Sequence, residues 1–153
     1  MNVALKPARR EDLPVLIRYV HAFQRLDHRP FNLHRTERAL LPLLTSADQG
    51  RVWLIEAAGR PVGYLALCYG YSLHSGGREA LVDGFFIDEE FRHRGIGTAV
   101  LRQVLGEARA AGVVAVHARP GAAADRARRL LTAAGLKCSD AGPMLSAELA
   151  PGA

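Results

Sequence analysis

Residues 79–98, EALVDGFFIDEEFRHRGIGT, decide how the rest of the chain is interpreted. The stretch begins with strand-forming apolar residues, passes an acidic turn at 88–90 and continues through RHRGIGT into an amphipathic helical pattern. Arg92, Gly95 and Gly97 carry the spacing R-x-x-G-x-G at the junction. Glycines allow backbone conformations and close approaches that a side chain would block. We therefore predict a strand, a tight basic loop and a helix that begins near Gly95.

The loop before the predicted helix is suited to a phosphate group. The first backbone N–H groups of a helix have no acceptor within it, and the helix dipole adds partial positive charge there. Arg92, His93 and Arg94 supply further donors for a polyanion. The spacing lacks the additional glycine of a dinucleotide-binding turn and the Gly-Lys-Ser/Thr of a Walker loop. The residues alone leave two interpretations: a phosphate-binding loop, or a tight strand-to-helix turn with an arginine-rich rim.

The same stretch resembles the GNAT acyltransferase superfamily, whose signature R/Q-x-x-G-x-G/A follows a strand. Here the signature is RHRGIG at 92–97, with Ile87 eight residues before Gly95. The resemblance implies an α/β fold with a mixed, mostly antiparallel central sheet, splayed at the acyl-CoA site and flanked by helices. It implies that the loop holds the acyl-CoA pyrophosphate and that the strand backbone contacts pantetheine and thioester. The implied acetyl-CoA-binding residues are Phe85, Phe86, Ile87, Arg92, His93, Arg94, Gly95, Ile96, Gly97 and Thr98.

Acyl transfer to an amine requires a donor to the thioester carbonyl oxygen and a group that deprotonates the amine. The resemblance assigns the donor to the backbone N–H of Phe85, since preorganised donors stabilise charge that develops on oxygen. Asp83 and Glu79 are the carboxylates on the strand, and either can act as the base directly or through water. Similarity to spermidine/spermine-type acetyltransferases, with a carboxylate two residues before the Phe85 position, favours Asp83. Both acids also have a structural interpretation: Asp83 as a hydrogen-bonded acid near a bulge and Glu79 as a solvated residue at the strand start.

Tyr71 is a third catalytic candidate. The segment YGYS at 69–72 is similar to a subset of these enzymes in which YS-x-x-x-GGR precedes the core strand, which places Tyr71 near the acceptor. The alternative is that Tyr69 and Tyr71 fill the sheet surface. Residues 26–32 form the loop that often makes up a wall of the substrate site in such families. His28, Phe31 and Asn32 are therefore weaker candidates for substrate contacts.

One departure from the family pattern concerns the acid that protonates the departing thiolate. The fourth-helix pattern is N-x-x-A-x-x-x-Y-x-x-x-G-F, and alignment on Ala127 and Gly135 places Leu131 at the tyrosine position. A general acid contributes about 10²–10⁴-fold to the rate, and leucine has no proton to give. Two hypotheses therefore remain. The first is an N-acetyltransferase that moves an acetyl group from acetyl-CoA to a primary amine of a small molecule by direct ternary-complex transfer. The second is a non-catalytic acyl-CoA-binding regulatory or interaction module.

Apolar periodicity predicts alternating strands and helices along the remaining chain. Residues Glu79, Leu81, Asp83, Phe85 and Ile87 share a face of the organising strand, unless a bulge at Gly84 breaks the register. The short segments LKC and MLSAEL are expected as closing strands. The predicted strands are 2–8, 51–57, 61–72, 79–87, 113–118, 136–138 and 144–149, and the predicted helices begin near residues 11, 34, 95 and 125.

Length and composition predict one domain over residues 1–149 with a loose tail at 150–153. The net charge is +5, and only Lys6 and Lys137 among the 20 basic residues are lysine. The arginines are spread along the chain, so a nucleic-acid partner has only net charge in its favour. Cys68 and Cys138 have no metal-site or disulfide spacing, and no segment approaches membrane-spanning length. We expect a cytoplasmic protein with no metal and a small-molecule amine as partner, and the family resemblance suggests a homodimer.

Overall fold

The computed structural model describes residues 2–119, 124–138 and 145–149. Four α-helices and two short 3-10 turns lie in these ranges together with five strands. The strands are β1 (Val3–Pro7), β2 (Gly50–Ala57), β3 (Arg60–Ser72), β4 (Gly77–Ile87) and β5 (Ala115–Ala118). The helices are α1 (Leu13–Leu26), α2 (Leu33–Thr45), α3 (Ile96–Ala110) and α4 (Ala124–Ala133), and the 3-10 turns are Arg10–Asp12 and Glu89–Phe91.

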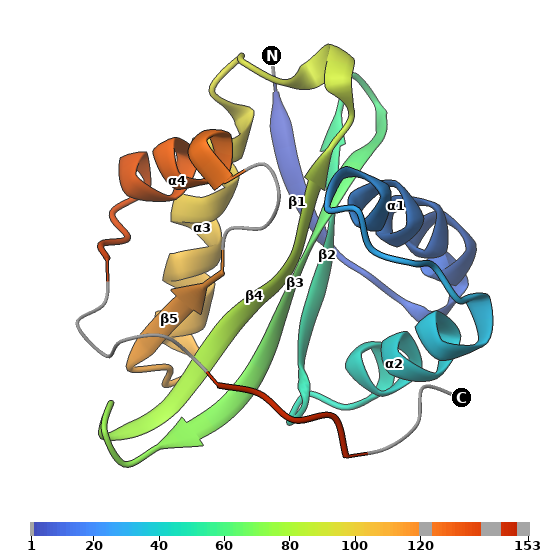
Figure 1. The fold of residues 1–153 in the computed structure, drawn as a ribbon. Coiled ribbons are helices and arrows are strands. Elements are labelled where there is room, and N and C mark those ends of the chain that lie inside the picture. Colours follow the sequence, from blue (N-terminus) through green and yellow to red (C-terminus); the bar gives the residue numbers. More distant parts are fainter. Residues whose placement is uncertain (1, 120–123, 139–144, 150–153) are drawn as a thin grey trace.

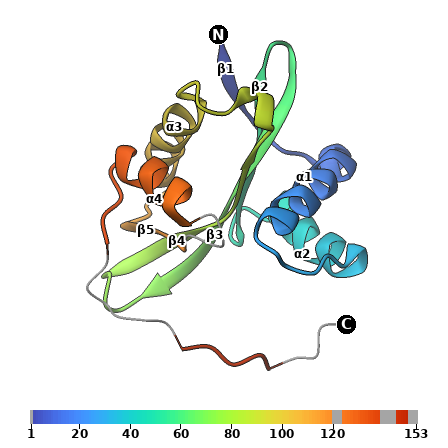
Figure 2. The same cartoon turned by 45° about the horizontal axis from the view of Figure 1, so that its top comes forward.

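The described strands form one sheet in the order β1-β2-β3-β4-β5. Neighbouring strands from β1 to β4 are antiparallel, whereas β5 is parallel to β4 and pairs with it only over residues 79–82. Helices α1 and α2 cover one face of the sheet, and α3 and α4 cover the other (Figures 1 and 2). The predicted α/β fold with a mixed, mostly antiparallel sheet and flanking helices is confirmed.

Two apolar clusters fasten the helices to the sheet. Under α3 and α4, the predicted helical stripe buries Val100, Leu101 and Val104. Under α1 and α2, Leu16 and Tyr19 are buried against the other face. Full burial of an aliphatic side chain contributes roughly 1.5–3 kcal/mol. The two clusters therefore hold the sheet between its two helix layers.

A β-bulge at Asp83 interrupts the alternation of side chains along β4. Val82 and Gly84 are opposite consecutive residues of β3, so Asp83 is the additional residue. A Cβ atom added to Gly84 would lie 2.4 Å from the Tyr64 hydroxyl oxygen, so glycine permits this close approach. Gly84 had suggested such a break in the alternation, because a glycine inside a strand often marks a bulge.

The side chains of β4 therefore change faces within the strand. Val82 before the bulge and Phe85 after it both pack in the cluster under α3, although strict alternation would put residues three positions apart on opposite faces. The bulge breaks the register, as the prediction allowed, so the five residues do not share one face: Glu79, Leu81 and Asp83 lie on the α1 side, and Phe85 and Ile87 lie on the α3 side.

The two predicted closing strands are absent from the described residues. Residues 136–138 and 145–149 have no strand structure, and Met144 lies outside the described range. Leu145 and Leu149 are 94% and 95% exposed. The alternation of apolar residues at 145–149 is typical of a strand. In the described part of the chain these residues pair with no other strand, and without a partner the local pattern does not produce one. The tail at 150–153 also lies outside the described range.

None of the described helices has the length and apolar character that crossing a bilayer requires. In the described ranges, no three His, Cys, Asp or Glu side chains converge in a way that could hold a metal ion.

Candidate functional site

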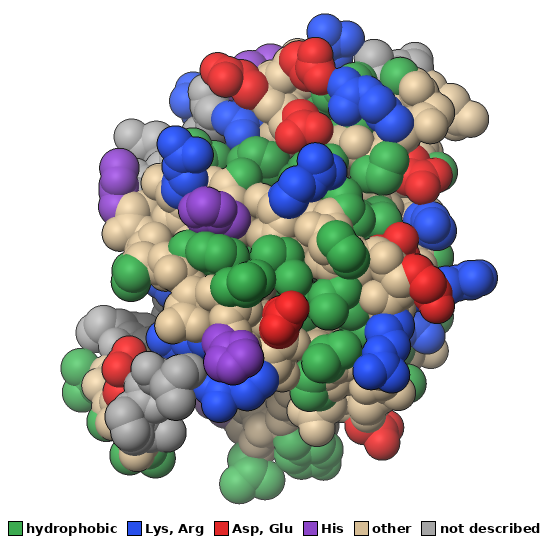
Figure 3. All heavy atoms as spheres, turned by 90° about the vertical axis from the view of Figure 1, so that its right-hand side faces the viewer, with side chains coloured by type: hydrophobic (Ala, Val, Ile, Leu, Met, Phe, Trp, Pro, Cys, Tyr) green, Lys and Arg blue, Asp and Glu red, His purple; other side chains and the backbone are tan. Residues whose placement is uncertain are grey.

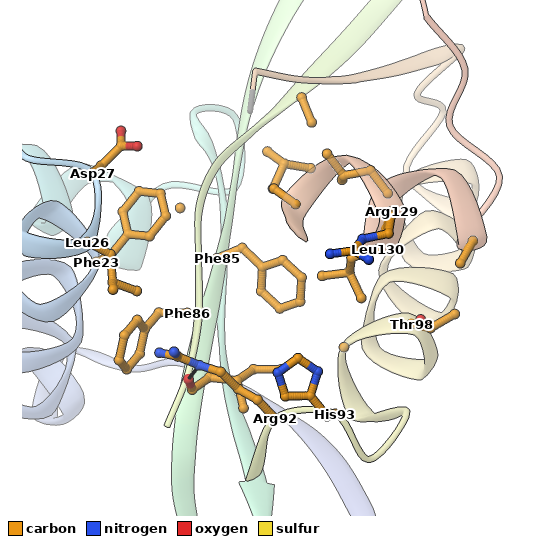
Figure 4. A pocket seen from close by; sticks show the side chains of 18 of the residues that line it. Phe23, Leu26, Asp27, Phe85, Phe86, Arg92, His93, Thr98, Arg129 and Leu130 are labelled. Atoms are coloured by element: carbon orange, nitrogen blue, oxygen red, sulfur yellow. Dashed lines mark hydrogen bonds between the residues drawn. The ribbon is translucent and has the colours of Figure 1, made fainter. Parts of the chain in front are cut away.

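A cavity of roughly 560 Å³ opens around the second half of β4. Figure 4 shows β4 running through its middle, with α1 on one side and α3 and α4 on the other. We call the part beside α1, lined by Phe23, Leu26, Asp27, Phe86 and Arg92, the α1 lobe. We call the remainder the α4 lobe; its described lining residues are Val82, Gly84, Phe85, Ile87, His93, Gly95, Gly97, Thr98, Ala118, Arg119, Ala127, Arg129, Leu130, Leu131 and Ala133.

One edge of β4 faces this cavity and pairs with no other strand in the described part of the chain. The pairing with β5 ends at Val82, opposite Ala118. The backbone N–H of Asp88 donates to Val62 O at 2.8 Å on the β3 side. Because backbone groups alternate in direction along a strand, those of Phe85 and Ile87 point to the other side, toward the cavity. The two strands thus separate where the family resemblance implied a splayed sheet.

The N-terminus of α3 presents backbone donors to the α4 lobe. Gly95 adopts a left-handed conformation with φ +79°, and the helix begins at the next residue. The first hydrogen bond of the helix runs from Ala99 N–H to Gly95 O at 3.2 Å, so the amides at 96–98 have no acceptor within the helix. These donors and the helix dipole make the position suitable for an anion.

The two glycines of the loop serve different purposes. No atom lies within 4 Å of a Cβ added to Gly95, so glycine is required there by its positive φ. A Cβ added to Gly97 would lie 2.9 Å from Leu130 Cδ1, so that glycine lets α4 approach α3. His93 also has a positive φ of +59°, a conformation that is uncommon for residues other than glycine.

The three basic residues of the loop point in different directions. Arg92 Nε donates to Ile87 O at 2.7 Å, and its guanidinium lies 5.1 Å from the ring centroid of Phe86, in the α1 lobe. His93 lines the cavity (Figure 4). The guanidinium of Arg94 lies over Phe91 at 5.8 Å and is absent from the described lining. The side chain of Ile96, another predicted binding residue, is buried in the core.

Residues 17–136 match the family model described as acetyltransferase (GNAT) family. The chain belongs to this family. A solved integron cassette protein from the mobile metagenome of Cole Harbour Salt Marsh is 30% identical, with a TM-score of 0.84 over 96% of this chain and 91% of that one. A protein from Clostridium acetobutylicum described as a predicted acetyltransferase, solved with acetyl-CoA, is 14% identical, with a TM-score of 0.79 over 95% and 96% of the two chains.

A curated relative is similar over a shorter region. The N-acetyltransferase MJ1207 of Methanocaldococcus jannaschii, itself named as uncharacterised, is 28% identical over 95 residues. The match covers 61% of this chain and 42% of that protein, which is less than half of the relative's length.

Neither of the acids predicted to act in this GNAT chain is in the described lining of the cavity. Asp83 is exposed at the bulge, between two lining residues, and Cys68 Sγ donates to its Oδ2 at 3.7 Å. Glu79 is further along the strand, where its Oε2 is 2.8 Å from His117 Nε2 and 3.1 Å from Ser75 Oγ. Burial, followed by the charge of Asp83 and its hydrogen bond, raises the pKa of the Cys68 thiol to about 11.

The structure places Tyr71 on the opposite face of the sheet from these acids. Its side chain is 78% exposed near the end of β3. Tyr71 is opposite Arg78 and lies two residues along β3 from Tyr69, which packs on the α3 side. Tyr71 is not among the described lining residues of the cavity, and its catalytic role stays a prediction.

Leu131, at the position where the GNAT pattern has tyrosine, lines the cavity. No tyrosine is among the described lining residues. Burial, followed by the charge of Asp88, raises the pKa of Tyr19 to about 12, and its hydroxyl lies 3.4 Å from Asp88 Oδ2. Burial also raises the pKa of Tyr64 above its ordinary value. Both hydroxyls stay protonated at neutral pH and lie outside the described lining.

Asp27 and the two arginines of the α4 lobe were missed from the sequence. Of the loop candidates at 26–32, Phe31 stacks on His21 and Asn32 caps α2 by accepting from Arg35 N–H. His28 is exposed and also lies outside the described lining. A signal for Asp27 was available, because it lies four residues after Phe23 and continues the buried stripe of α1 beyond the last helical residue.

Proposed function

We propose that the protein transfers an acetyl group from acetyl-CoA to a primary amine of a small molecule, directly within a ternary complex. The observation that carries this proposal is the cavity, which reaches both sides of β4 at a backbone edge that has no strand partner among the described residues. Two ligands entering from the α1 and α4 lobes can meet at this edge. Holding two reactants in contact supplies much of the rate enhancement of a bimolecular reaction.

The α4 lobe fits acetyl-CoA by the chemistry of its donors. The amides at 96–98 and the side chain of His93 are suited to the pyrophosphate, and the edge of β4 offers the backbone groups of Phe85 and the N–H of Ile87 to pantetheine, since Arg92 already contacts Ile87 O. Arg119 and Arg129 add positive charge to the lining. The relative solved with acetyl-CoA supports this assignment, since its fold is the same over nearly the whole chain. When bound, acetyl-CoA supplies an activated acetyl group.

Phe85 contributes its backbone N–H to the reaction. The amide is fixed within β4 and directed to the edge that faces the cavity, so it needs no rearrangement to donate to a carbonyl oxygen. Transfer forms a C–N bond to the amine and breaks the C–S bond, and the departing thiolate takes up a proton.

Asp83 is our assignment for the group that accepts the proton of the amine. It lies on the α1 side of β4, between Val82 and Gly84, which line the cavity. An exposed carboxylate can accept a proton through one intervening water as well as directly. Glu79 is a weaker choice because His117 and Ser75 already contact its carboxylate. Because Asp83 lies on the strand, spermidine-type amines stay among the proposed acceptors. The cytoplasmic location and the homodimer stay predictions.

A second candidate function is a regulatory or interaction module that binds acyl-CoA without turnover. Leu131 favours it, because a leucine lines the cavity where the family pattern has the tyrosine acid. Proximity and carbonyl polarisation would still operate without that acid. The two candidates differ only in whether thiol is released.

Calorimetry with acetyl-CoA, followed by measurement of thiol release on addition of an amine panel, tests the proposal. We expect binding and release, with Asp83→Asn retaining acetyl-CoA affinity and lowering turnover about tenfold or more. Glu148→Gln, a change at an exposed position outside the described lining, is the matched control. Binding without release over the whole panel favours the module, and absence of binding contradicts both candidates.

A further inference from the structure

We propose that Asp27 binds the positive charge of the acceptor and that this acceptor is an amine with an apolar carbon skeleton. The inference rests on the proposed function, and it names the chemistry that the α1 lobe selects. Three observations support it: a mostly buried carboxylate, the C-terminal end of a helix and two aromatic walls.

Asp27 is the sole acidic residue in the described lining of the cavity. Its side chain is only 12% exposed, whereas Asp83 is exposed and lies outside that lining. Figure 4 places Asp27 on the α1 side of β4, beyond Phe23 from the glycine loop. A carboxylate with little access to water interacts more strongly with a cation than one on the open surface.

The end of α1 adds negative potential at the same place. Asp27 directly follows the last residue of the helix, and its backbone N–H donates to Phe23 O and Arg25 O. The dipole of a helix gives its C-terminus partial negative charge, which stabilises cations nearby. The carboxylate and the helix end therefore favour the same charge on a ligand.

The walls of the α1 lobe are apolar and aromatic. Phe23 and Leu26 from α1 are on the same side of β4 as the ring of Phe86 (Figure 4). The molecular face that carries α1 and α2 also shows apolar side chains gathered at its centre, with most charges toward the rim (Figure 3). Such walls bury a hydrocarbon skeleton favourably, and an aromatic face attracts an ammonium group. A heavily hydroxylated acceptor would lose hydrogen bonds to water against them.

Two arginines already lie beside the α1 lobe, and they limit where an ammonium can bind. Arg29 Nε is 3.0 Å from Asp27 Oδ2, but the Arg29 side chain is 70% exposed. A carboxylate can accept several hydrogen bonds, so it can hold this arginine and an ammonium together. Arg92 lies over Phe86, with Nε bound to Ile87 O. The ammonium is therefore expected at the Asp27 end of the lobe.

The test is calorimetry of phenethylamine and its alcohol isostere, 2-phenylethanol, against the protein saturated with CoA. We expect the wild-type protein to bind the amine at least about tenfold more tightly than the alcohol. Asp27→Asn should lower amine affinity about tenfold, leave alcohol affinity unchanged and leave acetyl-CoA affinity unchanged. Asp27→Glu should restore part of the amine preference. Equal amine affinity in wild type and Asp27→Asn would overturn the inference.

Arg29→Ala separates charge recognition from support of the helix end. If Asp27 binds the ammonium, removal of the neighbouring guanidinium leaves amine affinity equal or higher. If the Asp27–Arg29 pair only supports the end of α1, both single variants weaken binding of amine and alcohol alike, and the inference is wrong. Asp48→Asn, an exposed acid between α2 and β2, is the matched control and should behave as wild type.

A comparison of amines tests the apolar part of the inference. Phenethylamine should bind more tightly than ethanolamine or glucosamine, and a preference for either polar amine would contradict the assigned walls. Acetyl-CoA affinity is measured first on each variant. Its absence in the wild-type protein would contradict the proposed function, whereas normal acetyl-CoA binding with amine binding independent of Asp27 would contradict this inference alone.

Discussion

The two halves of β4 share one neighbour and differ in the other. β3 pairs along the whole strand, whereas β5 pairs only with residues 79–82. The first half has a strand on each side, and its Glu79 contacts His117 of the neighbouring β5. The second half, 84–87, presents one backbone edge to the cavity. The comparison teaches that a bulge and a short partner strand can give one strand both a structural half and a binding half.

The largest effect on the open half is expected from Gly95→Val. A β-branched residue at φ +79° is strained, and relief of that strain would move the amides at 96–98. We expect acetyl-CoA affinity to fall about a hundredfold, measured by calorimetry. Gly106→Val in the same helix, where an added Cβ meets no atom within 4 Å, is the control and should bind normally. Equal affinity in both variants would remove the loop from the binding site.

The next largest effect is expected on stability, at the bulge that joins the two halves of β4. Gly84→Ala places a Cβ 2.4 Å from the Tyr64 hydroxyl oxygen within a buried cluster. We expect the free energy of unfolding to fall by about 2 kcal/mol in urea titrations. The same change in a Tyr64→Phe background should cost less, because the atom in closest contact is gone. An equal cost in both backgrounds would mean that the hydroxyl does not require the glycine.

Leu131→Tyr on α4 tests whether the open half of β4 lacks a proton donor for the departing thiolate. It restores a hydroxyl at a position that lines the cavity beside the open half. If the thiolate lacks an acid, kcat should rise about tenfold, within the range that general acids contribute. Leu131→Phe has the same ring without the proton donor and should give no such gain. A similar kcat in the two variants would show that the missing tyrosine does not limit turnover.

The smallest effect tests the contact between Cys68 and Asp83 at the bulge. Because burial and Asp83 raise the thiol pKa to about 11, Cys68 is almost entirely protonated at pH 8, and its alkylation should accelerate as the pH rises toward that value. Asp83→Asn removes a negative charge, so it should lower this pKa and speed alkylation roughly threefold. Mass spectrometry after iodoacetamide treatment measures the rate, with the exposed Cys138 as internal reference. Slower alkylation in the variant would contradict the proposed contact.

Local sequence determined much of the binding half. The glycine spacing, the start of α3 and the apolar stripe with Val100 and Val104 follow from backbone sterics and helical periodicity, which act over a few residues. The same local rules predicted strands at 136–138 and 144–149, and the described residues there form none. A strand needs a partner, and no local pattern supplies one.

Tertiary structure decided which side chains meet. The bulge at Asp83 moved Phe85 to the opposite face from Glu79, and the chain path brought Asp27, at the end of α1, to the cavity beside Phe86. Sequence alone predicted the family, the loop and the strand that belong to the site. It could not place the acids around the cavity, because register and helix docking depend on contacts between residues far apart in the chain.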